Sequence, residues 1–178
     1  MDEDELARIR EAFAKQPDVQ HVLELLLSEA RGLTHAEAGR VYLREGNRLR
    51  CAAVQNDVLT HRLGSDEAER RMTADSLNLV EPSIADYVAL TPSTINVVDA
   101  YEIPSDQPYR FDRHVDATTG YRTRSVLAMP IRARRGSVFG VLELINALNE
   151  VGGVIPFGKE QEATVEILLT TAARIVST

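Results

Sequence analysis

The sequence contains a single cysteine, Cys51, among its 178 residues. One thiol cannot form a disulfide within the chain, so nothing points to an oxidising compartment. Alternation along the strand expected here places Cys51 on one face with Leu49 and Ala53. This placement favours an inert core thiol over a redox or chromophore site.

Lysine is also scarce, since only Lys15 and Lys159 occur and arginine supplies the other basic residues. The chain has 27 acidic and 20 basic residues, which give a net charge of −7. A net-acidic chain without a basic block is a poor candidate for binding nucleic acid or an anionic membrane.

Long apolar runs are missing too. None reaches the length of a membrane span, and the N-terminal sequence MDEDELARIREAF lacks the basic and apolar regions of a signal peptide. We therefore expect a cytoplasmic protein. The hydrophobic share of 44% suits one globular domain with a core.

Catalytic signatures are a further absence. The four histidines occur in no nucleophile elbow and in no H-E-x-x-H pair, and there is no glycine-rich phosphate loop. We expect neither catalytic residues nor a metal site in this chain.

Helical periodicity marks both ends of the chain. Residues 3–14 carry Leu6, Ile9 and Phe13 on one helical face, and a second apolar stripe follows from residue 19. We expect residues 1–16 to form a linker or dimerisation helix. Residues 17–178 then form the globular domain, with 158–178 as its terminal helix.

Two strand pairs are predicted between the helices. Residues 38–57 read as a β-hairpin with its turn at Gly46-Asn47, and residues 125–131 and 137–146 form a second pair. Residues 57–82 are polar and weakly periodic, so we expect a long loop there, with a short helix or strand in it as an alternative.

The remaining segments of the chain are short. We expect a helix at 83–91, a strand at 93–100, an ordered loop at 101–111, one or two helical turns at 112–120, and a loop at 150–157. Hairpins combined with terminal helices predict an α+β fold with an antiparallel sheet.

Four blocks, SIADYVALT, INVVDAY, TGYRTRSVLAMPI and GVLELINA, occur in an order that resembles a GAF domain. The similarity is closest to the type found in cyclic-nucleotide phosphodiesterases, bacterial adenylate cyclases and bacterial HD-GYP phosphodiesterases, and it covers residues 17–177. It implies a PAS-related, six-stranded antiparallel sheet with the terminal helices on one face and a small-molecule pocket on the other. It also implies a regulatory module that often dimerises through its terminal helices.

Nucleotide-binding GAF domains share a motif written Asn-Lys, then Phe, three residues, and Asp-Glu. The chain matches it at Asn146, Phe157 and Glu162. Ala147 and Gln161 replace the Lys and Asp that form a salt bridge in the family, so no unpaired charge is left behind. Asp86 replaces a glycine that gives backbone room near the ligand.

The resemblance implies ligand-binding roles for Arg40, Gln55, Asn56, Ile84, Ala85, Asp116, Thr119 and Glu143. Arg40 can meet a ligand phosphate or carboxylate, or it can pair with Glu143 and fill the space. Glu143 shares a strand face with apolar residues, so it must face solvent, a pocket or an arginine. Asp116 and Thr119 lie over the ligand or simply cap a helix end.

Arg122 and Arg124 share one face at the start of a strand. We expect them to pair with Asp112 or Asp116 of the loop at 99–121, which would close the pocket. We call this arrangement the lid clasp. The alternative partner is a ligand phosphate.

Two functions remain open. The first is a sensory domain of a bacterial signal-transduction protein that binds a small ligand, with cyclic AMP or cyclic GMP favoured, and controls an output domain through a homodimer. The second is a ligand-free module for dimerisation and signal transmission. Ala147, Gln161, Asp86 and the bulk of Arg40 favour the second.

Overall fold

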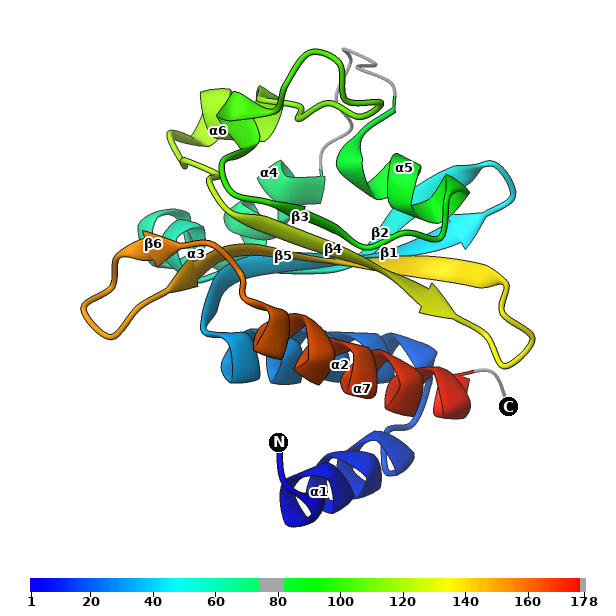
Figure 1. The fold of residues 1–178 in the computed structure, drawn as a ribbon. Coiled ribbons are helices and arrows are strands. Elements are labelled where there is room, and N and C mark those ends of the chain that lie inside the picture. Colours follow the sequence, from blue (N-terminus) through cyan, green and yellow to red (C-terminus); the bar gives the residue numbers. More distant parts are fainter. Residues whose placement is uncertain (74–81, 177–178) are drawn as a thin grey trace.

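The computed structural model describes residues 1–73 and 82–176. Figure 1 shows a sheet with helices on both faces and one further helix below. The helices and strands are α1 (Glu3–Ala14), α2 (Val19–Thr34), β1 (Ala36–Glu45), β2 (Arg48–Asn56), α3 (Asp57–Leu63), α4 (Ser65–Thr73), α5 (Ile84–Leu90), β3 (Ile95–Val97), a 3-10 turn (Ala100–Glu102), α6 (His114–Thr119), β4 (Val126–Arg132), β5 (Val138–Leu148), β6 (Val154–Ile155) and α7 (Lys159–Val176).

The sheet has six strands in the order β2-β1-β5-β4-β3, with β6 paired to one end of β5. Every pairing is antiparallel. The predicted α+β fold with a six-stranded antiparallel sheet is therefore confirmed. Nearly all residues of β5 are buried because this strand is covered on both faces.

Helices from the two ends of the chain pack on one face of the sheet, while α3, α4, α5 and α6 lie on the other (Figure 1). Gly39 of β1 explains how closely α2 approaches. A Cβ atom there would lie 2.8 Å from Cδ1 of Leu27 and 2.9 Å from the Glu143 carbonyl oxygen. A side chain at position 39 would therefore push α2 away from the sheet.

In the expected loop at 57–82, residues 57–73 form the two short helices α3 and α4, so the helical alternative holds there and the loop does not. The side-chain oxygen of Asn56 accepts a hydrogen bond from the Leu59 amide and so caps α3. α4 buries only Ala68 and Met72, and this narrow stripe is why a polar loop was expected. Residues 74–81 of the expected loop lie outside the described residues.

The expected loop at 150–157 contains the short strand β6, which was not predicted from the sequence.

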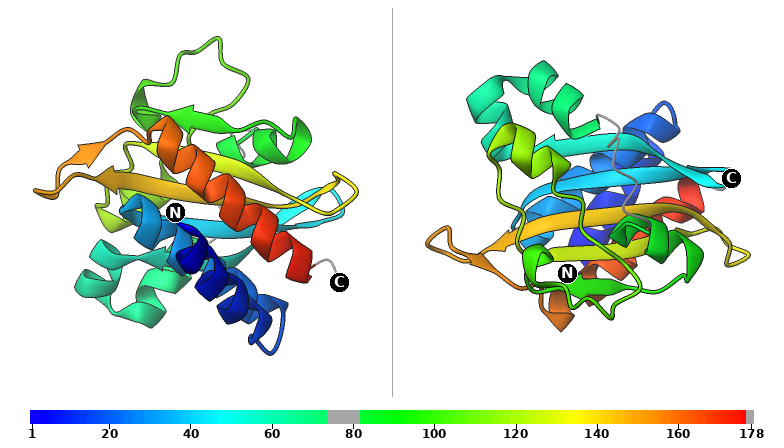
Figure 2. Two further views of the ribbon diagram at one scale, coloured as in Figure 1. Left: turned by 60° about the horizontal axis from the view of Figure 1, so that its bottom comes forward. Right: turned by 90° about the horizontal axis from the view of Figure 1, so that it is seen from above.

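α1 packs against α2 and α7 of its own chain (Figure 2, left). Ile9 and Phe13 are fully buried and belong to the same core cluster as α2 and α7. The apolar stripe expected to pair with a second copy is therefore largely used within the chain. Arg8 adds an ion pair with Glu29 of α2 at 3.0 Å.

No helix in the described part of the chain is long and apolar enough to cross a membrane.

Replacing Phe13 with alanine tests the docking of α1. The change removes a fully buried ring, so we expect the free energy of unfolding in urea to fall by about 3 to 5 kcal/mol. Arg10→Ala, at an exposed position of the same helix, is the control and should change the free energy of unfolding by less than about 0.5 kcal/mol. Equal stability of the two variants would show that α1 is not docked in solution.

Candidate functional site

The centre of the candidate site is a buried polar group on the sheet face that α5 covers. Arg40 on β1 and Glu143 on β5 are register partners in the ladder. The Arg40 Nη1 atom donates a hydrogen bond to the Tyr42 hydroxyl at 3.1 Å and lies 3.9 Å from Oε1 of Glu143. From the sequence, Glu143 could either line a pocket or form an ion pair. In the structure it forms an ion pair with Arg40.

The walls around this group are apolar. Ile84 and Ala85 of α5 are buried in a cluster that also contains Val141 and includes Tyr42 at its margin. A capping box between Ser83 and Asp86 starts α5, and the helix packs against β4 and β5. Asp86, which stands where family members have glycine, is therefore used to begin the helix.

Burial sets the electrostatics of this pair. Burial raises the pKa of the Glu143 carboxyl, the Arg40 guanidinium opposes this rise, and Asp86 adds to it. Burial alone would lower the pKa of Arg40, but Tyr42 and Glu143 raise it above its usual value, so the guanidinium stays charged. The site thus keeps a fixed cation beside a carboxyl that takes up a proton more readily than usual.

Two buried side-chain donors in the described part of the chain have no hydrogen-bond acceptor: Arg40 Nε and Asn56 Nδ2. Arg40 lies on β1 and Asn56 on the adjacent strand β2. Asn56 pairs with Ala38, which is two residues from Arg40 on the same strand, so both side chains lie on the same face of the sheet. Leaving a buried donor unsatisfied costs about 1 to 3 kcal/mol. An acceptor placed beside either atom would remove this cost.

A cavity of about 330 Å³ opens beside Asn56, between the end of β2, α3 and α4. It is lined by Arg31, Val54, Gln55, Asn56, Asp57, Thr60, Ser65, Ala68, Glu69 and Met72. Most of these side chains are polar, and Asn56 is 2% exposed. The cavity can therefore hold a polar group next to the unsatisfied amide.

Gln55 is placed differently from Asn56, because neighbouring residues of a strand face opposite sides. The Gln55 side chain binds Arg31 and Ser28 of α2, at 2.8 Å in both cases. The sequence grouped Gln55 with Asn56 as contacts to one ligand. The structure corrects this grouping, since Gln55 reaches the rim of the cavity but points toward α2.

Asp116 and Thr119 are engaged in local hydrogen bonds. The Asp116 carboxylate accepts from the Tyr101 hydroxyl at 2.8 Å, the Thr123 amide at 2.7 Å and the Thr123 hydroxyl at 2.9 Å. Thr119 Oγ1 donates to the Val115 carbonyl at 2.6 Å. The Asp116 bonds run to residues outside α6, so they tie this helix to its neighbours and do not cap its end.

The acid of the lid clasp is Asp99, so the expected partners were wrong. Arg122 and Arg124 approach Asp99 at 3.4 and 3.7 Å, and the Arg122 guanidinium lies 3.6 Å from the centroid of the Tyr101 ring. Asp112 instead accepts from the His114 amide at 2.8 Å. Asp99 also accepts from the Tyr101 amide at 2.9 Å, so it caps the 3-10 turn and faces both arginines. Both arginines are more than half exposed, so each pair contributes little on its own.

Asn146 joins the lid segment to the sheet, a role that the sequence motif alone did not specify. Its Oδ1 accepts from the Arg124 amide at 2.7 Å, and its Nδ2 donates to the Arg122 carbonyl and the Tyr121 hydroxyl, both at 2.9 Å. The Tyr121 hydroxyl in turn donates to Glu37 at 2.5 Å. Asn146 has a φ of 56°, a left-handed conformation that asparagine tolerates better than most residues.

Neutral contacts occupy the positions of the family's salt bridge. Ala147 is fully buried, while Gln161 donates to the Thr34 carbonyl at 2.8 Å and accepts from the Gly158 amide at 2.7 Å. Gln161 thereby ties the start of α7 to the end of α2. The segment is held without a charge pair.

Cys51 is half-buried, and its thiol lies 3.6 Å from the Ala53 carbonyl oxygen. Burial raises its pKa, and a thiol that stays protonated is a weak nucleophile. The residues that the structure describes contain no group of three or more His, Cys, Asp or Glu side chains that could hold a metal ion.

The family model for the GAF domain matches residues 18–177. A cGMP-specific 3',5'-cyclic phosphodiesterase of Drosophila ananassae is 32% identical over 138 residues, 76% of this chain and 12% of that protein. A dual 3',5'-cyclic-AMP and -GMP phosphodiesterase 11 of Drosophila melanogaster is 30% identical over 164 residues, 91% of this chain and 10% of that protein. The chain thus spans about a tenth of the length of these relatives.

Solved structures share the fold. The GAF domain of an Acinetobacter phosphoenolpyruvate-protein phosphotransferase superposes with a TM-score of 0.69 at 17% identity, covering 99% of this chain and 95% of that one. A free methionine-R-sulfoxide reductase from Neisseria meningitidis superposes with a TM-score of 0.65 at 15% identity, covering 96% of this chain and 85% of that one. At these identities the similarity concerns the fold alone.

A titration of Glu143 tests the electrostatics of the buried pair. The folded protein should hold the Glu143 proton to a higher pH than the unfolded chain does. The protonated Glu143 carboxyl then stabilises the folded state at pH values below the pKa that Glu143 has in the unfolded chain. This contribution is lost as the pH rises through the higher pKa that Glu143 has in the folded protein. Carbon-13 NMR of the Glu143 carboxyl should report a pKa above the ordinary glutamate value.

Arg40→Met should raise the Glu143 pKa further, because it removes the cation that opposes burial. Arg44→Met, four residues along the same strand at an exposed position, is the matched control and should leave the titration unchanged. An ordinary Glu143 pKa in the wild type would contradict the buried pair.

Proposed function

The chain belongs to the GAF domain family over residues 18–177, and from that premise we propose that it is a sensory domain that binds a small, acceptor-rich ligand. The ligand lies against the sheet face covered by α5 and closed by the segment at 99–121. Binding there controls an output domain, and the chain itself carries no catalysis.

The observation that carries this proposal is the pair of unsatisfied buried donors, Arg40 Nε and Asn56 Nδ2. A ligand phosphate or carboxylate would give each donor an acceptor, and a charge-assisted bond to Arg40 would be the stronger one. Glu143 would accept from an N–H group of the ligand, and Ile84 and Ala85 would form the side wall.

Cyclic AMP and cyclic GMP are the ligands we favour. A cyclic nucleotide offers phosphate oxygens to Arg40 and a base with N–H groups to Glu143. The printed names of the curated relatives, phosphodiesterases of cyclic GMP and of both cyclic nucleotides, support this chemistry.

We further propose that the chain is part of a bacterial, cytoplasmic signalling protein and forms a homodimer through its terminal helices. The matched region is only 12% and 10% of these relatives, which supports a covalently linked output domain. Ligand binding would order the segment at 99–121, and the change would reach α7 through Asn146 and the end of β5.

A second candidate is a ligand-free module that only dimerises and transmits a signal. The neutral contacts of Ala147 and Gln161, together with the ion pair that Arg40 makes with Glu143, favour it. In this case the Arg40 side chain fills the space that a ligand would take.

Thermal denaturation with cyclic AMP and cyclic GMP distinguishes the two candidates. A ligand at a hundred times its dissociation constant stabilises the folded state by about 2.7 kcal/mol, so the melting temperature should rise with one of them. Arg40→Met and Asn56→Asp should reduce the shift. Asn56→Asp removes the unsatisfied amide NH2 group but keeps the oxygen that caps α3, so the helix stays capped.

Arg44→Met should keep the full shift, because its side chain is exposed and binds the Gly46 carbonyl. An unchanged melting temperature at millimolar concentrations of both nucleotides would exclude them as ligands and would favour the ligand-free module.

A further inference from the structure

A groove of about 300 Å³ lies between α7 and the start of the turn that joins β4 to β5. Its floor is apolar and contains Pro130, Leu169 and Ala173, which are all buried. Its rim is cationic, with Arg132, Arg134 and Arg174 around the opening. None of these residues belongs to the proposed ligand site.

The charge of this groove stands out against that of the whole chain. The net charge is −7, yet three arginines line one groove and Arg135 follows directly in the turn. Glu166 lines the groove as well and offsets part of this charge. An apolar floor with an arginine rim fits a segment that carries several carboxylates next to an apolar side chain.

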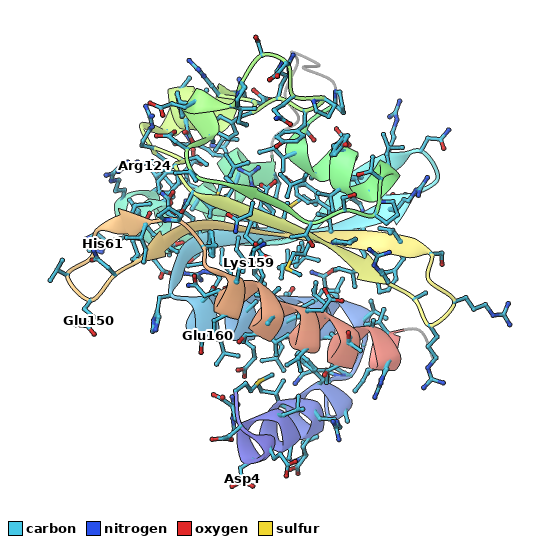
Figure 3. All side chains as sticks on the ribbon, in the orientation of Figure 1. Asp4, His61, Arg124, Glu150, Lys159 and Glu160 are labelled. Carbon is cyan, nitrogen blue, oxygen red and sulfur yellow. The ribbon has the colours of Figure 1, made fainter. Side chains whose placement is uncertain are left out.

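The chain itself contains such a segment at residues 1–6, Met-Asp-Glu-Asp-Glu-Leu. Met1 is 39% exposed, and Glu3 and Asp4 are exposed as well. Figure 3 shows Asp4 projecting away from the body of the molecule at the far side of α1. The N-terminus and the turn between β4 and β5 lie apart in every view, so the segment does not reach the groove of its own chain (Figures 1 and 2).

We infer that the acidic first turn of α1 from one copy docks in the arginine groove of a second copy. This inference rests on the proposed homodimer and names its contact. In a two-fold dimer the contact occurs twice, because each copy offers one acidic turn and one groove. Exposed ion pairs are individually weak and are screened by salt, so the apolar contact of Met1 with the groove floor adds to them.

Analytical ultracentrifugation of the purified chain tests this contact through charge reversal. Arg132→Glu with Arg134→Glu should raise the dimer dissociation constant at least about tenfold, because like charges then meet across the interface. Arg48→Glu with Arg62→Glu changes the net charge equally at two exposed positions away from the groove, and it should leave the constant unchanged. The wild-type constant should also rise with salt.

The reciprocal swap separates a lost contact from misfolding. Glu3→Arg with Asp4→Arg should weaken the dimer as much as the groove reversal does, and it keeps Asp2 as the helix cap. A chain with all four substitutions should dimerise again, because each reversed turn then meets a reversed groove. A mixture of the two double variants should form a heterodimer.

Three results would overturn the inference. A dimer insensitive to groove reversal and to salt would place the interface elsewhere while leaving the proposed homodimer intact. A four-substitution chain that stays monomeric would exclude the charge contact. A wild type that is monomeric at all concentrations would exclude both the contact and the homodimer, whereas ligand binding, measured separately, would be unaffected.

Discussion

The antiparallel pairing of β1 with β5 is the constraint on which the other parts of this structure depend. It places Arg40 opposite Glu143 at the centre of the sheet, and it leaves Gly39 as the point where α2 approaches the backbone. A shift of one residue in this register would turn Arg40 into the core under α2 and α7 and would place Val41 in the polar site. The site and the helix layer are therefore fixed by the same ladder.

The predictable parts of the fold are those with a strong period. The stripes of α2 and α7 and the turn at Gly46-Asn47 were found from the sequence because burial imposes a pattern on them. α3 and α4 were only an alternative to a loop because α4 buries only Ala68 and Met72, and α1 was identified as a helix without its contacts to α2 and α7 of the same chain. A periodic pattern identifies a buried face but not the surface that covers it.

The candidate site shows the same division. Arg40, Asn56 and Glu143 were identified from the sequence, and their side chains do lie on one sheet face. The ion-pair partner of Arg122 and Arg124 was not, because Asp99, Asp112 and Asp116 are all close along the chain. Each of the three accepts from a backbone amide, and only the position of Asp99 beside the two guanidinium groups distinguishes it.

The central claim is that Arg40 Nε and Asn56 Nδ2 are ligand donors, and NMR observes both groups directly. In ¹H–¹⁵N spectra recorded with cyclic AMP or cyclic GMP, the Arg40 Nε–H and the Asn56 side-chain amide should both shift, and the Arg40 proton should move downfield as it bonds to an oxygen acceptor. The Gln55 amide, which already binds Ser28, should shift less. A spectrum in which a nucleotide binds but both donor signals stay unchanged would contradict the account.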